Sequence, residues 1–124
     1  MSETTGRHQE VVLKDPHLVR IRSGSRKGAL VCPVGESLHL VGNEKKLIVV
    51  HFLLERPMRF NELTKLGIDS KTLSRVLKKM EKDGLVNRNV SSTPFLVQYS
   101  LTEMGKELKQ AIDSLWSWAN RWII

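Results

Sequence analysis

The chain has 124 residues, 40% of them hydrophobic and 27% charged, and its 20 Lys and Arg against 13 Asp and Glu give a formal net charge of +7. This composition excludes a wholly disordered protein, and the lack of any apolar run of about 18 residues excludes a transmembrane helix. We therefore expect one folded domain and no signal peptide. The single cysteine, Cys32, cannot form an internal disulfide, which is typical of a reducing compartment. The positive charge favours a nucleic-acid partner over an anionic membrane surface.

The first 31 residues are predicted to be a basic N-terminal extension that is partly disordered. Residues 1–9 are polar and show no periodicity, which is typical of a disordered tail. Residues 10–31 contain short apolar pieces broken by glycine and proline, so that both short strands and loops are compatible with them. The extension has a net charge of +3. Residues 32–124 are expected to form the folded domain.

Four helices are predicted in the first half of this domain. Apolar residues at helical spacing, together with helix stop signals, indicate helices over 33–42, 44–55, 59–66 and 70–83. A buried strand is the competing interpretation of the second segment because it contains adjacent β-branched residues, but its length favours a helix. Gly67 and Gly84 end the last two helices. Two helices joined by a turn that contains glycine, the second one basic, are the layout of a helix-turn-helix.

A β-hairpin and one more helix are predicted to follow. Residues 85–90 and 95–101 alternate between apolar and polar around a polar turn at 91–94, although this turn lacks an Asn-Gly signature. In the second strand the apolar positions are Phe95, Val97, Tyr99 and Leu101. Thr102 caps a last helix over 103–122. A helix-turn-helix followed at once by a hairpin is the winged-helix arrangement, so the predicted fold class is mainly α (α+β), with a C-terminal helix.

The basic helix over 70–83 has two unlike sides. The side at core-facing spacing carries Leu73, Val76, Leu77 and Met80. The opposite side carries Lys71, Arg75, Lys78 and Lys82. A solvated helix face is the simpler interpretation of such cations. The preceding turn and the polar hairpin that follows instead favour a recognition helix.

An α-helix fits the major groove of B-DNA, and the residues near its N-terminus reach the base edges. The side chains of suitable type there are Ser70, Lys71, Thr72, Ser74 and Arg75. Arg75 can offer two donors to the O6 and N7 of guanine. Lys78 and Lys79 lie later on the helix and are expected on phosphates, which position a protein without reading sequence.

Two further segments are predicted to contact DNA. Residues 88–95 form the wing, on the backbone or in the minor groove, through Arg88, Ser91, Ser92 and Thr93. Arg59 begins the preceding helix, where its side chain and the helix N-terminus can meet a phosphate.

Four motifs in this order closely resemble the HxlR family of winged-helix transcriptional regulators. They are Cys32-Pro33-Val34, Arg59-Phe60-Asn61-Glu62-Leu63, the segment from Leu77 through Asp83-Gly84-Leu85-Val86 to Arg88, and Tyr99-Ser100-Leu101-Thr102-Glu103-Met104-Gly105. The chain departs from the family at Gly42-Asn43-Glu44-Lys45, where members usually carry Gly-Gly-Lys-Trp. The resemblance implies a homodimer built from the first and last helices that binds a two-fold operator. In some members a cysteine at the position of Cys32 senses oxidants or electrophiles.

The end of the last helix supports a dimer independently. Trp116 fits the apolar stripe that would face the core, whereas Trp118 points elsewhere, and a helix that is apolar on more than one side needs a second surface. Packing of all the tryptophans within one monomer is the alternative. The predicted dimer interface is Leu115, Trp116, Trp118 and Trp122.

No catalytic or metal-binding pattern is recognisable. The four histidines are scattered without ligand spacing, and no phosphate loop, G-x-S-x-G or H-E-x-x-H motif occurs. Cys32 directly precedes a helix, and a helix N-terminus favours a thiolate, but a buried inert cysteine is the alternative interpretation. We therefore expect no enzyme, no cofactor and no metal site.

These observations predict a sequence-specific transcriptional regulator that binds double-stranded DNA as a homodimer, in the cytoplasm and associated with the nucleoid. We expect no membrane partner, and the sequence does not indicate which small-molecule or redox effector the protein would bind. The alternatives are a non-specific architectural DNA-binding protein and a winged-helix protein–protein adaptor.

Overall fold

The computed structural model describes residues 16–124, which fall into two units that meet at Gly42 and Asn43. The predicted disordered tail at 1–9 lies outside the described residues. In the first unit β1 (Val19–Arg20) pairs with β2 (Leu30–Val31) as an antiparallel hairpin, and the Arg20 guanidinium donates to the Gly28 carbonyl at 2.9 Å. In the described part of the predicted segment 10–31, both interpretations therefore apply, since two short strands are joined by turns and loop. Helix α2 (Pro33–Val41) follows and has no buried residue.

The second unit begins with α3 (Glu44–Leu53), so the helical interpretation of this apolar segment is confirmed. The side-chain oxygen of Asn43 accepts from the backbone N–H groups of Lys45 and Lys46, which gives two of the first-turn donors a partner. The buried residues of α3 are Val49, Val50 and Leu53.

The helix-turn-helix consists of α4 (Phe60–Thr64) and α5 (Ser70–Lys82). The prediction that the first of these helices begins at Arg59 and runs to residue 66 is wrong at both ends. Arg59 belongs to the two-residue strand β3 (Met58–Arg59), which pairs antiparallel with β5. Two residues are too few to show the alternation by which a strand is recognised in sequence.

Helix α5 has defined caps at both ends. The Asp69 carboxylate accepts from the Thr72 backbone N–H at 3.3 Å. At the other end Gly84 has a φ of +82°, the Leu85 N–H donates to the Met80 carbonyl at 2.9 Å, and the Gly84 N–H donates to the Glu81 carbonyl at 3.1 Å. These bonds form a Schellman motif, which requires a residue in the left-handed region and so favours glycine.

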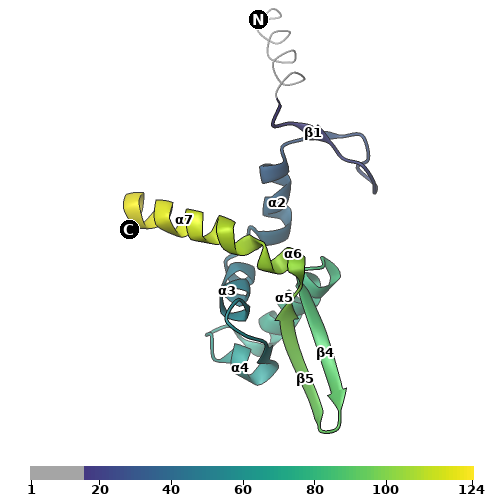
Figure 1. Cartoon of the computed structure of the whole chain (residues 1–124), viewed down its shortest axis with the longest axis vertical. Coiled ribbons are helices and arrows are strands. Elements are labelled where there is room, and N and C mark those ends of the chain that lie inside the picture. The colour runs from purple at the N-terminus through teal and green to yellow at the C-terminus, as the bar shows by residue number, and fades with distance from the viewer. Residues whose placement is uncertain (1–15) are drawn as a thin grey trace, which may run out of the picture. The chain divides into compact units, whose positions relative to one another are not determined.

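The wing consists of β4 (Val86–Ser92) and β5 (Phe95–Leu101), which pair over their full length in a sheet of order β3-β5-β4. Figure 1 shows them as two long strands whose turn lies at the end far from α6. The turn is Thr93–Pro94 alone, joined by a cis peptide bond, and not the predicted 91–94. Phe95 is 76% exposed, which contradicts its place in the predicted apolar alternation, because the hairpin extends past the core.

The predicted last helix is interrupted at Glu107, which separates α6 (Glu103–Lys106) from α7 (Leu108–Trp122). Thr102 caps α6 as predicted, since its hydroxyl accepts from the Gly105 N–H at 3.1 Å. The expectation that Trp116 faces the core is wrong for the single chain. Its side chain is 67% exposed, and α7 contains no buried residue.

The hydrophobic core of the second unit lies between α3, the helix-turn-helix and the base of the wing. Its buried members are Val49, Val50, Leu53, Met58, Leu63, Ile68, Leu73, Leu77, Met80, Leu85, Val86 and Leu101. The fold is a winged helix-turn-helix of the predicted mainly α (α+β) class, with a C-terminal helix.

Candidate nucleic-acid interface

Helix α5 buries one side and exposes the other, as the sequence predicts. Leu73, Leu77 and Met80 are buried and Val76 is half-buried, so this side is held against the core. The cations of the opposite side are all exposed: Lys71, Arg75, Lys78 and Lys82. The core therefore fixes the direction in which this row of positive charge faces.

Most of these cations have no partner among the residues that the structure describes. Across residues 16–124, no hydrogen bond or ion pair uses the side chains of Lys71, Arg75, Lys78, Lys82 or Arg88. The Nζ of Lys79, in contrast, lies 3.0 Å from Asp83 Oδ1. Lys79 is thus directed along the helix toward its C-terminus, while the other cations are available to an anionic partner.

The N-terminal turn of α5 presents small polar side chains beside this row. Ser70 and Ser74 are exposed, but Thr72 is half-buried. A hydrogen bond from the Thr72 side chain lowers the pKa of Asp69 below its ordinary value, and the Thr72 backbone N–H and the charge of Arg75 act in the same direction. Thr72 thus serves the cap, which leaves its hydroxyl less available than those of the two serines.

Arg59 lies directly before α4 with an exposed side chain. Its backbone N–H donates to Glu62 Oε1 at 3.1 Å, while Glu62 Oε2 lies 2.6 Å from the Arg56 guanidinium. The Arg56 hydrogen bond is the main reason why the pKa of Glu62 is lowered. Arg56, which is not among the predicted site residues, thus neutralises the nearby carboxylate.

The wing is tied to the end of α5. The Thr102 hydroxyl donates to the Gly84 carbonyl at 2.6 Å, and the Thr102 N–H donates to the Leu85 carbonyl at 3.1 Å. Gly105 packs so closely that an added Cβ would collide with the Leu85 carbonyl oxygen. These contacts hold the wing and α5 in one geometry. The predicted wing side chains Arg88, Ser91, Ser92 and Thr93 are all exposed.

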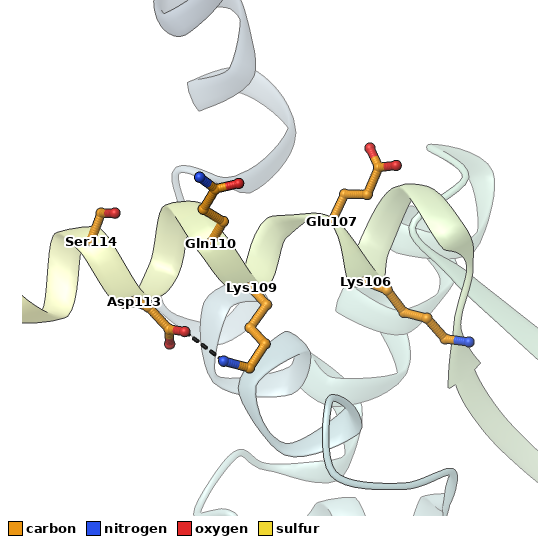
Figure 2. Close-up of a pocket in the computed structure, with 6 residues that line it drawn as sticks. All are labelled: Lys106, Glu107, Lys109, Gln110, Asp113 and Ser114. Atoms are coloured by element: carbon orange, nitrogen blue, oxygen red, sulfur yellow. Dashed lines mark hydrogen bonds and ion pairs between the residues drawn. The ribbon is translucent and has the colours of Figure 1, made fainter.

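The polar side of α6 and α7 forms a surface depression that contains none of the predicted site residues. In Figure 2 the side chains that line it project in two directions, with Glu107, Gln110 and Ser114 above the helices and Lys106, Lys109 and Asp113 below them in this view. Lys109 and Asp113 are joined by an ion pair of 2.6 Å. This pair has the i,i+4 spacing of solvated helices. The depression therefore has the character of an ordinary helix surface.

The apolar side chains in the C-terminal part of α7 are exposed. The predicted interface residues Leu115, Trp116, Trp118 and Trp122 are all more than half exposed. In Figure 1 α7 leads away from α6 toward the C-terminus. Three indole rings on one short helix make a large apolar surface, which in soluble proteins often marks a contact with another molecule.

Cys32 is exposed and occupies the N-cap position of α2, so the alternative that it is buried is wrong. No group of three or more His, Cys, Asp or Glu that could hold a metal ion occurs among residues 16–124. In the same part of the chain no helix is long and apolar enough to cross a membrane.

The chain matches the model of the family described as HxlR-like helix-turn-helix over residues 40–124. It is 35% identical to the HTH-type transcriptional regulator YodB of Bacillus subtilis (strain 168) over 98 residues, which cover 76% of this chain and 88% of YodB. It is also 35% identical over 94 residues to YdeP of the same organism, an uncharacterized HTH-type transcriptional regulator, covering 73% of each chain.

Solved structures of regulators also match this chain. The reduced form of YodB superposes with a TM-score of 0.67 at 36% identity, covering 75% of this chain and 95% of YodB. The redox regulator HypR in its oxidized form superposes with a TM-score of 0.66 at 32% identity, covering 73% of this chain and 96% of HypR. YodB has also been solved after diamide treatment and with a bound quinone. The chain is therefore a member of the HxlR family of winged helix-turn-helix, DNA-binding transcriptional regulators.

Proposed function

We propose that this protein is a sequence-specific regulator that binds double-stranded DNA as a homodimer, with α5 in the major groove. The observation that carries the proposal is the row of exposed cations on α5, which have no partner within residues 16–124 and lie opposite the side chains that anchor the helix to the core. An α-helix fits the major groove, and residues near its start reach the base edges. Residues 88–95 form the wing, which lies on the backbone or in the minor groove.

The side chains divide into those that read bases and those that position the protein. We assign base contacts to the first turns of α5, through Ser70, Lys71, Thr72, Ser74 and Arg75. Arg75 can give two donors to one guanine. Phosphate contacts are assigned to Arg59, Lys78 and Lys79. Contacts with the backbone or the minor groove are assigned to the wing residues Arg88, Ser91, Ser92 and Thr93. Because Lys79 already forms an ion pair with Asp83, we expect it to contribute less to DNA affinity than Lys78 does.

The homodimer is proposed to form through the exposed apolar side chains of α7. Leu115, Trp116, Trp118 and Trp122 would be covered by the same residues of a second copy, as a two-fold interface requires. A two-fold dimer would present two copies of α5 to half-sites separated by one helical turn, about 34–36 Å.

The proposal also covers the organisation of the chain. Residues 1–31 are a basic extension, and residues 32–124 are the DNA-binding domain including the C-terminal helix. A protein that binds chromosomal DNA works in the cytoplasm at the nucleoid. We infer no enzymatic activity and no cofactor.

Binding to selected and random duplexes over a salt series separates the three candidate functions. A specific regulator keeps a large preference for its selected site as salt rises. A non-specific architectural protein loses nearly all of its affinity, because its binding is mostly counterion release. A protein–protein adaptor binds neither duplex, and that result would overturn the proposal.

A second proposal concerns Cys32 as a redox or electrophile sensor. The thiol is exposed at the N-cap position of α2, where a reagent in solution can reach it. Structures of the relative YodB include a quinone-bound form. Addition of the thiolate to a quinone forms one thioether bond and leaves the ring at the hydroquinone level. With one cysteine per chain, a disulfide formed by diamide must join two chains.

The sensor proposal is tested by measuring duplex affinity before and after treatment with benzoquinone or diamide. We expect a change in affinity in the wild type and none in Cys32→Ser. Wild-type protein that carries the adduct, as shown by its mass, and binds DNA unchanged would overturn the proposal.

A further inference from the structure

The wing ends in an apolar tip. Pro94 is in the turn, and Phe95 follows it with 76% of its surface exposed. Val90, on the other strand, is 53% exposed. Exposure of a whole phenyl ring is unfavourable in water, and the neighbouring residues 91–93 are polar. The tip therefore combines a polar surface with one large apolar projection.

The strand register places this projection on the same side of the wing as a cation. Ser92 lies opposite Phe95, Val90 opposite Val97, and Arg88 opposite Tyr99. Side chains directly opposite each other share a face of the sheet, and every second residue along a strand returns to that face. Arg88, Val90 and Phe95 therefore share one face. At its inner end this face carries the core residues Val86 and Leu101, which form the pair nearest α6.

The charge around the tip favours an anionic partner. No Asp or Glu occurs from residue 84 to residue 102, and Arg88 is the one charged residue in this range. The Arg88 side chain has no hydrogen bond or ion pair within residues 16–124. The minor groove of DNA matches this combination, because phosphates line its rim and apolar base stacks lie between them.

We propose that Phe95, supported by Pro94, is a wedge that inserts from the minor groove between two base pairs and kinks the duplex. Phe and Pro are among the side chains that unstack base steps in this way. Pyrimidine–purine steps such as TA and CA unstack most easily, so the wedge would select them without any hydrogen bond to a base. This inference rests on the proposed DNA-binding function and adds a determinant of specificity in the wing.

The test uses the full-length protein and a duplex selected by the wild type. Resonance energy transfer between dyes at the two duplex ends measures the bend, and 2-aminopurine beside the candidate step reports unstacking. The variants are Phe95→Ala and Phe95→Leu, with Val90→Ala as the matched control, since Val90 is exposed on the same face. Because Phe95 lies outside the core, all variants should keep the circular dichroism of the wild type.

We expect the wild type to bend the duplex by about 20–90° with a rise in 2-aminopurine fluorescence. Phe95→Ala should lose most of both signals and most of the preference for TA over AA at that step, while Phe95→Leu and Val90→Ala keep them. An unchanged bend in Phe95→Ala, an equal loss in Val90→Ala, or a change of oligomeric state in Phe95→Ala would overturn the wedge.

The experiment distinguishes failure of the wedge from failure of the DNA-binding function. If the wild type binds its selected duplex and Phe95→Ala matches it in every signal, the wedge is wrong and the DNA-binding function stands. If the wild type shows no preference among duplexes, the proposed function itself is wrong.

Discussion

Helices α5 and α7 are both amphipathic, yet they use their apolar sides in opposite ways. In α5 the side chains of Leu73, Leu77 and Met80 are buried in the core of the same chain. In α7 no residue is buried, and Trp122 is 71% exposed. An apolar stripe in the sequence therefore predicts that a helix face will be covered, but it does not predict whether the same chain or another molecule covers it. The described part of a single chain completes the environment of α5 but leaves the apolar side chains of α7 uncovered.

The largest expected effect is the loss of stability on truncation of the α5 anchor. Leu77→Ala should destabilise the fold by about 2–5 kcal/mol at every protein concentration, because it leaves a cavity in the core. Urea unfolding followed by circular dichroism measures this. Trp122→Ala is the control from α7, and its effect on stability should disappear on dilution. A loss in Trp122→Ala that persists on dilution would contradict the contrast between the two helices.

Next in size is the effect of the α7 face on association. Trp118→Ser combined with Trp122→Ser should weaken self-association by at least about 30-fold, as expected when central aromatic anchors are removed. Sedimentation equilibrium measures the association, and unchanged circular dichroism would show that the fold is kept. A wild type that stays monomeric at high concentration would show that α7 has another partner.

A smaller effect is expected where the wing joins α5. Gly105→Ala should cost about 1–3 kcal/mol, since the new methyl group collides with the Leu85 carbonyl. Gly35→Ala is the matched control, because the nearest atom to a Cβ there is 3.8 Å away, in Cys32, and alanine favours a helix. Thermal unfolding of both variants gives the comparison, and equal melting temperatures would contradict the close packing of Gly105 against Leu85.

The smallest effect concerns the N-terminal cap of α5. The lowered pKa of Asp69 means that its carboxylate stabilises the fold at pH values above its ordinary pKa, and that this contribution is lost as pH falls through the lowered pKa. The stability difference between wild type and Asp69→Asn should therefore shrink as the pH is taken from about 6 to about 2. Urea unfolding over that range measures it. A difference that grows on acidification would contradict the cap.

Much of this arrangement is predictable from sequence because its signals are local. Asp69 before α5 and Gly84 after it mark the helix boundaries, and the spacing of apolar residues identifies the buried side of α5. Strand β3 carries no such signal, since it is too short. The break at Glu107 has no proline, and Gly105 two residues before it does not by itself mark where a helix is interrupted. The exposure of Phe95 and Trp116 depends on how far the wing and α7 extend beyond the core, which no local pattern encodes.

The most direct test of the account compares two cations of the α5 row. Affinities for the selected duplex and for a duplex altered at the bound guanine are measured for wild type, Arg75→Ala and Lys78→Ala. Arg75→Ala should lose about 1–3 kcal/mol on the selected duplex and most of its preference between the two, while Lys78→Ala loses affinity equally on both. An equal loss on both duplexes for Arg75→Ala would contradict base reading by this helix.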